Sequence, residues 1–195
     1  MRQLRKLSDT QPELFMLEAA LTHLRITDGA ETPVLQQYLA AACEAFERLT
    51  GRCTLTQIFE LSVSEWPKNG KLSLGRAPVN AIHSVSYADE DDVNTDVEAA
   101  TYALVQPEDA SGELHLRDAF TWPTPSDAPD AIKVQFEAGF SDWASVPATQ
   151  KQAILYLTAH FYELRTPINV GNIVNEVPLT FTALLNLNRI GGFVG

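Results

Sequence analysis

The histidine and carboxylate side chains of this sequence are the ones that could bind a metal ion or catalyse a reaction. His160 and Glu163 stand three residues apart in an apolar stretch, a spacing that places two possible metal ligands on one helix face. No second pair of this kind occurs in the sequence to complete a site. The sequence motifs of phosphate-binding loops, dinucleotide folds, zinc proteases and serine hydrolases are also absent. We therefore expect His160 to be an interior or interface residue, and we predict no metal, no cofactor and no catalytic residue.

An acidic stretch in the middle of the chain has part of the spacing of an EF-hand calcium loop. Asp92, Asn94 and Asp96 match its first three ligand positions. However, the sixth position is Val97 instead of glycine, and the twelfth is Ala103 instead of a bidentate glutamate. The sequence therefore excludes an EF-hand and predicts a solvated hairpin tip, with a loose cation site in the same loop as the alternative.

The net charge of −11 comes from this same region. Residues 89–130 contain twelve acidic side chains and one basic, Arg117, whereas the other residues contain thirteen of each sign. Negative charge of this density repels phosphate, which disfavours a nucleic-acid-binding protein. The candidate functional acids, which we call the acidic loop, are Asp89, Glu90, Asp91, Asp92 and Asp96.

Length and composition predict a globular protein. A chain of 195 residues with 45% apolar residues is long enough for one domain, or for a compact body with a tail. Cys43 and Cys53 are too few for a disulfide framework, so we expect buried thiols in a reducing compartment. No apolar run approaches the roughly 18–20 residues of a membrane span, and a secretion signal is not expected.

Helical periodicity brackets the middle of the chain. A first helix is expected near residues 15–25. Thr32 followed by Pro33 predicts an N-cap and the first turn of a second helix, which Gly51 ends. Glu44 and Arg48 are expected to pair one turn apart. The apolar stripe of the second helix is predicted to contain Leu35, Leu39, Ala42, Phe46 and Leu49.

Period-two alternation and turn residues predict strands between the helices. The expected strands span residues 54–66, 71–74, 82–87, 101–105, 113–116 and 131–140. Because consecutive strands are close in sequence, an antiparallel meander or a small barrel-like sheet is expected.

The last third of the chain is unusually apolar. A helix predicted from about residue 147 to 165 has almost no polar face in its second half, so both sides of it must be covered. A short helix is expected at residues 180–189 in the tail that follows. The candidate contacts with a partner protein or another subunit are Phe161, Tyr162, Val174, Val177, Leu179, Phe181, Leu184, Leu185, Ile190 and Phe193.

These elements predict an α+β fold. Residues 1–53 and 141–166 are expected to form a helical body, with a β-rich insertion at 54–140 and an extended C-terminal arm at 167–195.

The order of several short sequence blocks resembles the head–tail connector (adaptor) proteins of tailed bacteriophages and gene transfer agents. The blocks are LEAALTHLRI at 17–26, TGR at 50–52, LGRAPV at 74–79, FEAGF at 136–140, FYELR at 161–165 and VPL at 177–179. The resemblance extends over nearly the whole chain.

This resemblance implies a non-enzymatic virion protein at the head–tail junction, assembled in the bacterial host cytoplasm. It implies a homo-oligomeric ring of about a dozen copies beneath the portal protein, with a tail or stopper protein as a further partner. DNA would pass through the ring without sequence-specific binding, and no membrane is involved. Two alternatives remain: a tail-tube or tail-completion subunit, and a carboxylate-based enzyme or ligand binder. The acidic loop could line the DNA channel or lie on the outer rim.

Overall fold

A computed structural model describes residues 2–8, 12–27, 29–108, 110–117, 120–163 and 179–191, with side chains except at 12–15, 179 and 180. Within these residues the fold is α+β, as the sequence predicted. The helices are α1 (Pro12–Leu24), α2 (Thr32–Thr50), α3 (Ala148–Glu163) and α4 (Leu179–Asn188), with 3-10 turns at Gly29–Glu31 and Ala99–Thr101. The strands are β1 (Arg2–Lys6), β2 (Gln57–Val63), β3 (Lys71–Ser73), β4 (Val79–Ala88), β5 (Asn94–Asp96), β6 (Tyr102–Val105), β7 (Glu113–Leu116) and β8 (Ile132–Ala138).

The chain forms two compact units, each assembled from separate stretches of sequence. The β unit contains residues 1–10, 56–139 and 190–195, and the helical unit contains residues 11–55 and 140–189. The sequence predicted no strand before residue 54, but Arg2–Lys6 is a strand paired with β2. This strand has one apolar residue, Leu4, so it shows no hydrophobic alternation, and only pairing with a distant strand defines it.

The C-terminal end of α2 follows from its sequence. Gly51 adopts a left-handed conformation with φ of 78°, and its N–H donates to the Glu47 carbonyl at 3.0 Å. Glu44 and Arg48 form the predicted ion pair at 3.4 Å. At the start, Glu31 and not Thr32 is the N-cap residue, because the preceding 3-10 turn runs directly into the helix.

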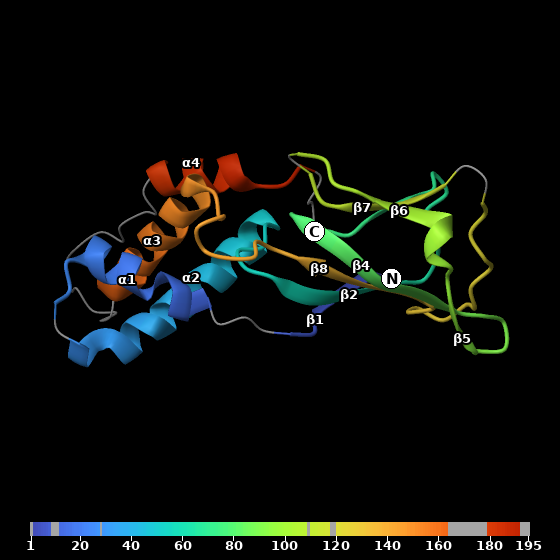
Figure 1. Cartoon of the computed structure of the whole chain (residues 1–195), viewed down its shortest axis with the longest axis horizontal. Coiled ribbons are helices and arrows are strands. Elements are labelled where there is room, and N and C mark those ends of the chain that lie inside the picture. The colour runs from blue at the N-terminus through green and yellow to red at the C-terminus, as the bar shows by residue number, and fades with distance from the viewer. Residues whose placement is uncertain are drawn as a thin grey trace, which may run out of the picture. The chain divides into compact units, whose positions relative to one another are not determined.

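The core of the helical unit is built around α2, whose predicted stripe is buried except for Leu49, which is 45% exposed. Helix α2 packs on both α1 and α3, and α4 packs on α3 and α2 (Figure 1). The buried core residues are Met16, Ala20, Leu35, Leu39, Ala42, Cys43, Phe46, Ala153, Ile154, Leu157 and Phe181. The two cysteines of the chain are buried thiols, as predicted.

The large sheet of the β unit has the strand order β1-β2-β8-β4-β5, and every pairing is antiparallel. The predicted antiparallel pairing is confirmed, but a simple meander is wrong because β8 lies between β2 and β4. In the register of β2 with β8, Phe59 lies opposite Phe136, and their rings stack at 5.6 Å. Every second residue of β8 is buried, as the alternation predicted.

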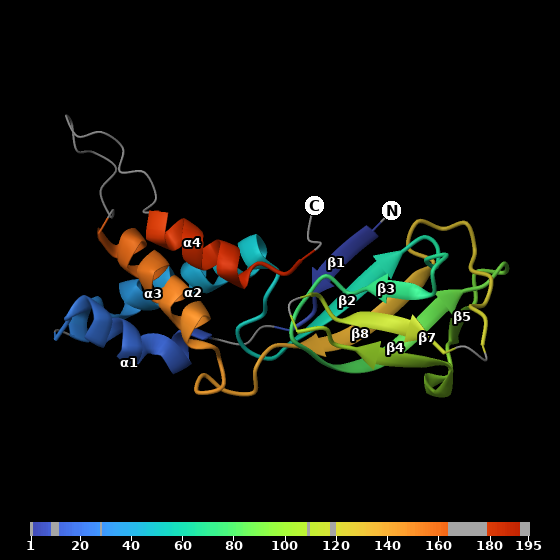
Figure 2. The ribbon, with the colours of Figure 1, turned by 90° about the horizontal axis from the view of Figure 1, so that it is seen from above.

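A smaller sheet with the order β3-β7-β6 forms a second layer over one face of the large sheet (Figures 1 and 2). Leu72 of β3 and Leu114 of β7 are buried in this layer. The two sheets pack tightly at Gly112, just before β7, where an added Cβ would lie 2.5 Å from Val79 Cγ2 of β4. Glycine is therefore required at this position by space.

Candidate functional site

Helix α4 makes up most of the described part of the predicted C-terminal arm, and it packs on its own chain. Phe181 is 8% exposed in the core of the helical unit. Leu184 and Leu185 are half-buried against the same core. The short helix predicted at residues 180–189 is therefore confirmed, and its apolar side is largely covered within one copy.

Hydrogen bonds also fix the end of α4 on α2 and α3. Arg52 Nε donates to the Asn188 carbonyl at 2.7 Å, and Thr149 Oγ1 donates to Asn188 Oδ1 at 3.0 Å. Arg189 Nε donates to the Leu49 carbonyl at 3.3 Å. Arg52, which follows α2, thus binds a carbonyl at the C-terminal end of α4, and Arg189, which follows α4, binds one at the C-terminal end of α2. The last carbonyls of a helix lack partners within the helix.

Leu187 is the functional candidate that sequence reasoning missed. Its side chain is 72% exposed, the largest value among the large apolar side chains of the described residues. At about 100° of rotation per residue, Leu187 lies roughly 120° from Phe181 and 160° from Leu185, away from the face that these residues form with Asn188. Helical spacing indicated the buried face of α4, and a leucine off that face gave no signal of its own.

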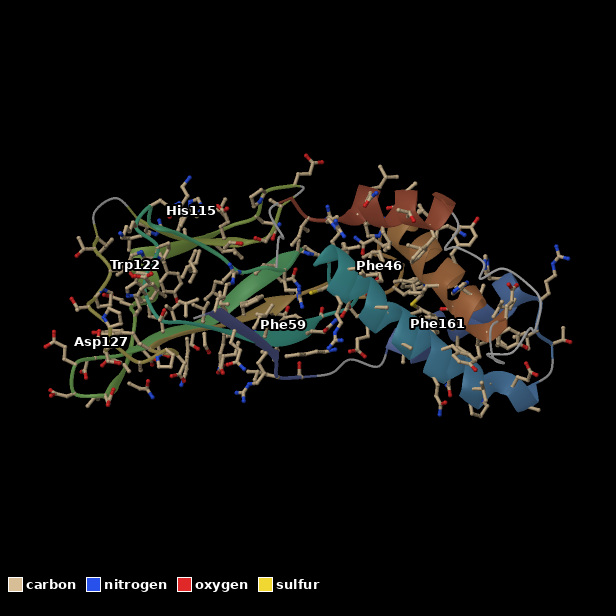
Figure 3. All side chains as sticks on the ribbon, turned by 180° about the vertical axis from the view of Figure 1, so that it is seen from behind. Phe46, Phe59, His115, Trp122, Asp127 and Phe161 are labelled. Carbon is tan, nitrogen blue, oxygen red and sulfur yellow. The ribbon has the colours of Figure 1, made fainter. Side chains whose placement is uncertain are left out.

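Phe161, labelled in Figure 3, and Tyr162 beside it in the sequence are half-buried near the end of α3. The Tyr162 hydroxyl donates to the Glu31 carboxylate, and its ring meets that of Tyr38 edge-on at 6.5 Å. These two candidate contacts therefore keep part of their surface accessible. His160, on the same helix, is half-buried and has the Phe161 ring 6.3 Å away.

The remaining candidate contacts are placed unevenly. Ile190 is 1% exposed and so offers no surface. Val174, Val177 and Phe193 lie outside the described residues, as does the side chain of Leu179.

The acidic loop is the tip of the hairpin formed by β4 and β5, in agreement with the predicted solvated hairpin tip. Asp89 Oδ1 accepts the backbone N–H groups of Asp91 and Val93, each at 3.0 Å. Asp92 has a φ of 58°, a left-handed conformation that aspartate tolerates. The other acidic side chains point to solvent, and Asp96 is exposed on β5. The loop is thus closed by its own backbone and by one carboxylate.

Among the described residues, no three histidine, cysteine or acidic side chains come close enough to share a metal ion.

One tyrosine and one aspartate outside the acidic loop have shifted pKa values. Burial, with a smaller effect of Asp96, raises the pKa of Tyr102. The Ser145 N–H donates to Asp142 at 2.8 Å and lowers the pKa of that carboxyl group.

Two tryptophans pack together in the β unit. The rings of Trp66 and Trp122 are parallel at 4.1 Å, and Trp66 Nε1 donates to the Pro123 carbonyl at 2.9 Å. Figure 3 shows Trp122 and Asp127 at the same end of this unit. Trp143, in the helical unit, has the Lys151 ammonium group 5.2 Å from its ring centre.

The two units differ in charge. The β unit has sixteen acidic and eight basic residues, whereas the helical unit has nine and six. Most of the net charge of −11 therefore belongs to the β unit.

None of the helices in the described ranges has the length and apolar character needed to cross a membrane.

No protein-family model matches the sequence, and no curated protein matches it significantly. Solved structures of gene transfer agent (GTA) particles, in contrast, contain chains that match it. A chain in the neck of an empty GTA particle computed with C6 symmetry is 26% identical, with a TM-score of 0.80. A chain in the virion of a native GTA particle has the same identity and a TM-score of 0.81.

A chain in the neck of a native GTA particle computed with C12 symmetry is also 26% identical, with a TM-score of 0.78. Each of the three matches covers 99% of this chain and 98% of the other. This chain is thus similar over its full length to a protein of the GTA neck.

Proposed function

We propose that this chain is a structural, non-enzymatic subunit of the neck of a phage virion or gene transfer agent particle, where it joins the DNA-filled head to the tail. The full-length similarity to a chain of the GTA neck carries this proposal. Because almost none of either chain lies outside the match, the similarity includes the helical unit, the β unit and the C-terminal arm.

The proposed assembly is a ring of copies beneath the portal, with DNA passing through its centre. The similar necks were computed with C6 and C12 symmetry, which supports an oligomer of this kind. A heterologous contact repeated about such an axis closes into a ring. Many weak contacts around a ring give high avidity and need no deep pocket on the subunit. The negative charge of the β unit disfavours adhesion of DNA near it, so DNA can slide.

The C-terminal arm, residues 167–195, is the proposed contact with the portal or with a neighbouring copy. Its described part, α4, is held by hydrogen bonds from Arg52 and Thr149 and presents Leu187 to solvent. A rigidly held, exposed leucine loses little conformational entropy when a partner covers it.

Electron microscopy of the purified chain mixed with the matching portal ring tests this proposal. A ring of added density beneath the portal is the expected result. Truncation before α4 is a poor test because Phe181 belongs to the core. Leu187→Asp is the better variant, and it should reduce portal occupancy severalfold without a change in the free protein's circular dichroism.

Val105→Asp is the matched control, since Val105 is 38% exposed on β6 in the other unit. It should leave portal occupancy unchanged. Binding to tail-tube proteins with none to the portal would overturn the proposal in favour of a tail-completion subunit. Equal effects of the two substitutions would remove α4 from the proposed contact.

A further inference from the structure

In the part of the chain that the structure describes, the large sheet of the β unit has two edge strands, and each has a neighbouring strand on one side only. Strand β1 pairs with β2, and β5 pairs with β4, at opposite ends of the strand order. Figure 2 shows β1 and β5 on opposite sides of this sheet. Open edges of this kind are templates for pairing with another chain.

The hydrogen-bond pattern identifies which backbone groups point outward. Leu7 N–H donates to the Ile58 carbonyl, so alternation along β1 directs the backbone groups of Arg2 and Leu4 away from β2. Asp89 N–H donates to the Val93 carbonyl, and the same alternation directs those of Asn94 and Asp96 away from β4. Both edges therefore present backbone donors and acceptors to a further strand.

The two edges carry opposite charge. Strand β1 has three basic residues among five, and its polar side chains are exposed. Part of that charge is engaged locally: Arg5 pairs with Glu60 at 3.1 Å and remains 64% exposed, and Arg2 Nη2 donates to the Ser73 carbonyl. The β5 edge, by contrast, has Asp96 and the four acids of the adjoining tip.

We infer that the β5 edge of one copy pairs with the β1 edge of the next, so that the large sheet continues from copy to copy. The inference rests on the proposed ring and names the contact that closes it. Every copy carries both complementary edges, as a heterologous ring requires. A two-fold dimer through either edge would instead place like charges together, and opposite charges fix the order of copies.

The pairing between copies is parallel. Four successive antiparallel pairings, from β1 through β2, β8 and β4 to β5, give β1 and β5 the same direction. Copies related by rotation about an axis along the strands keep that direction. Backbone hydrogen bonds then provide the contact, and the edge charges provide its specificity.

Thiol cross-linking of rings formed on the portal tests the contact. Gln3→Cys combined with Asn94→Cys places one exposed thiol on each edge, while native Cys43 and Cys53 are buried. A short thiol-specific cross-linker should produce a ladder of covalent multimers on a denaturing gel. Gln3→Cys combined with Val105→Cys, on β6 of the other sheet, is the control and should give no ladder.

Charge reversal provides the second measurement. Asp96→Lys should raise the concentration needed for ring formation about tenfold, because the β5 edge would lose part of its charge complementarity to the basic β1 edge. Circular dichroism verifies that each variant folds.

Rings that form on the portal without a ladder, and without any effect of Asp96→Lys, would overturn the edge contact and leave the neck proposal standing. The charges would then serve only to keep sheet edges apart. If no ring forms on the portal at all, the neck proposal fails and this contact fails with it.

Discussion

The helical unit and the β unit reach their folds by different means. In the helical unit, apolar stripes of α1, α2 and α3 converge on one core, and nine acidic residues are nearly balanced by six basic ones. In the β unit, two sheets pack closely at Gly112, and sixteen acidic residues face eight basic ones. The helical unit therefore depends mainly on apolar volume, whereas the β unit depends on close layer packing and carries the charge and the open strand edges available for assembly.

The largest expected effect is loss of core volume in the helical unit. Phe46 of α2 is 0% exposed, so Phe46→Ala should lower the free energy of unfolding by about 3–5 kcal/mol. Denaturant titration followed by the helical circular dichroism signal measures this loss. Leu49→Ala, at a 45% exposed position of the same helix, should change stability by no more than about 0.5 kcal/mol. Similar losses at both positions would contradict a core centred on the buried stripe.

Excess volume should be the sensitive change in the β unit. Gly112→Ala puts a Cβ within 2.5 Å of Val79 Cγ2, and displacement of the two layers should cost about 1–3 kcal/mol. The stacked pair of Trp66 and Trp122 supplies a circular dichroism signal specific to this unit. Gly29→Ala is the control, because nothing lies within 4 Å of its added Cβ. An unaltered stability of Gly112→Ala would show that the layers are loosely packed.

Backbone strain should affect the two units equally. Gly51 ends α2 with φ of 78°, and Gly70 forms a turn in the β unit with φ of 71°. Alanine at either position should cost about 1–2 kcal/mol, because left-handed backbone is unfavourable for a residue with a Cβ. Asparagine, which tolerates this conformation, should cost less at both positions. A loss confined to one unit would indicate that its turn relaxes to another conformation.

The smallest expected effect concerns pH and the turn before α3. The N–H of Ser145 lowers the pKa of Asp142, so the ionised carboxylate is favoured in the folded state. Its stabilisation is fully present above the ordinary pKa of 3.8 and is lost as pH falls through the lowered value. Asp142→Asn should therefore flatten the acid limb of the stability profile slightly. Titration of the Asp142 carboxyl group by NMR checks the direction, and a pKa above 3.8 would contradict it.

Much of the fold was predictable where the local signal is strong. The stripe of α2 with Gly51, the alternation in β2 and β8, and the turn at the acidic loop each appear within a few residues. Strand β1 was missed because RQLRK carries no alternation, and β5 because three polar residues give none. The partner of β1, strand β2, lies far away in the sequence. Strand β5 lies close to its partner β4, but it is too short to show alternation.

Part of the candidate site was likewise predictable from local sequence, and part was not. Periodicity predicted the apolar face of α4, but not that Phe181 and Ile190 are buried while Leu187 is 72% exposed. The arginine contacts that hold α4 join residues about 136 and 140 positions apart, as in Arg52 with Asn188 and Arg189 with Leu49. No local pattern encodes such contacts.

The sequence by itself determined the end of α2 at Gly51, most strands and the concentration of negative charge in residues 89–130. These properties depend on neighbouring residues and on periodicity along one element. Only the tertiary structure decided that β8 lies between β2 and β4, and that a basic strand and an acidic strand form opposite edges of one sheet. The physical reason is that strand order is fixed by hydrogen bonds between distant segments, which depend on the fold of the whole unit.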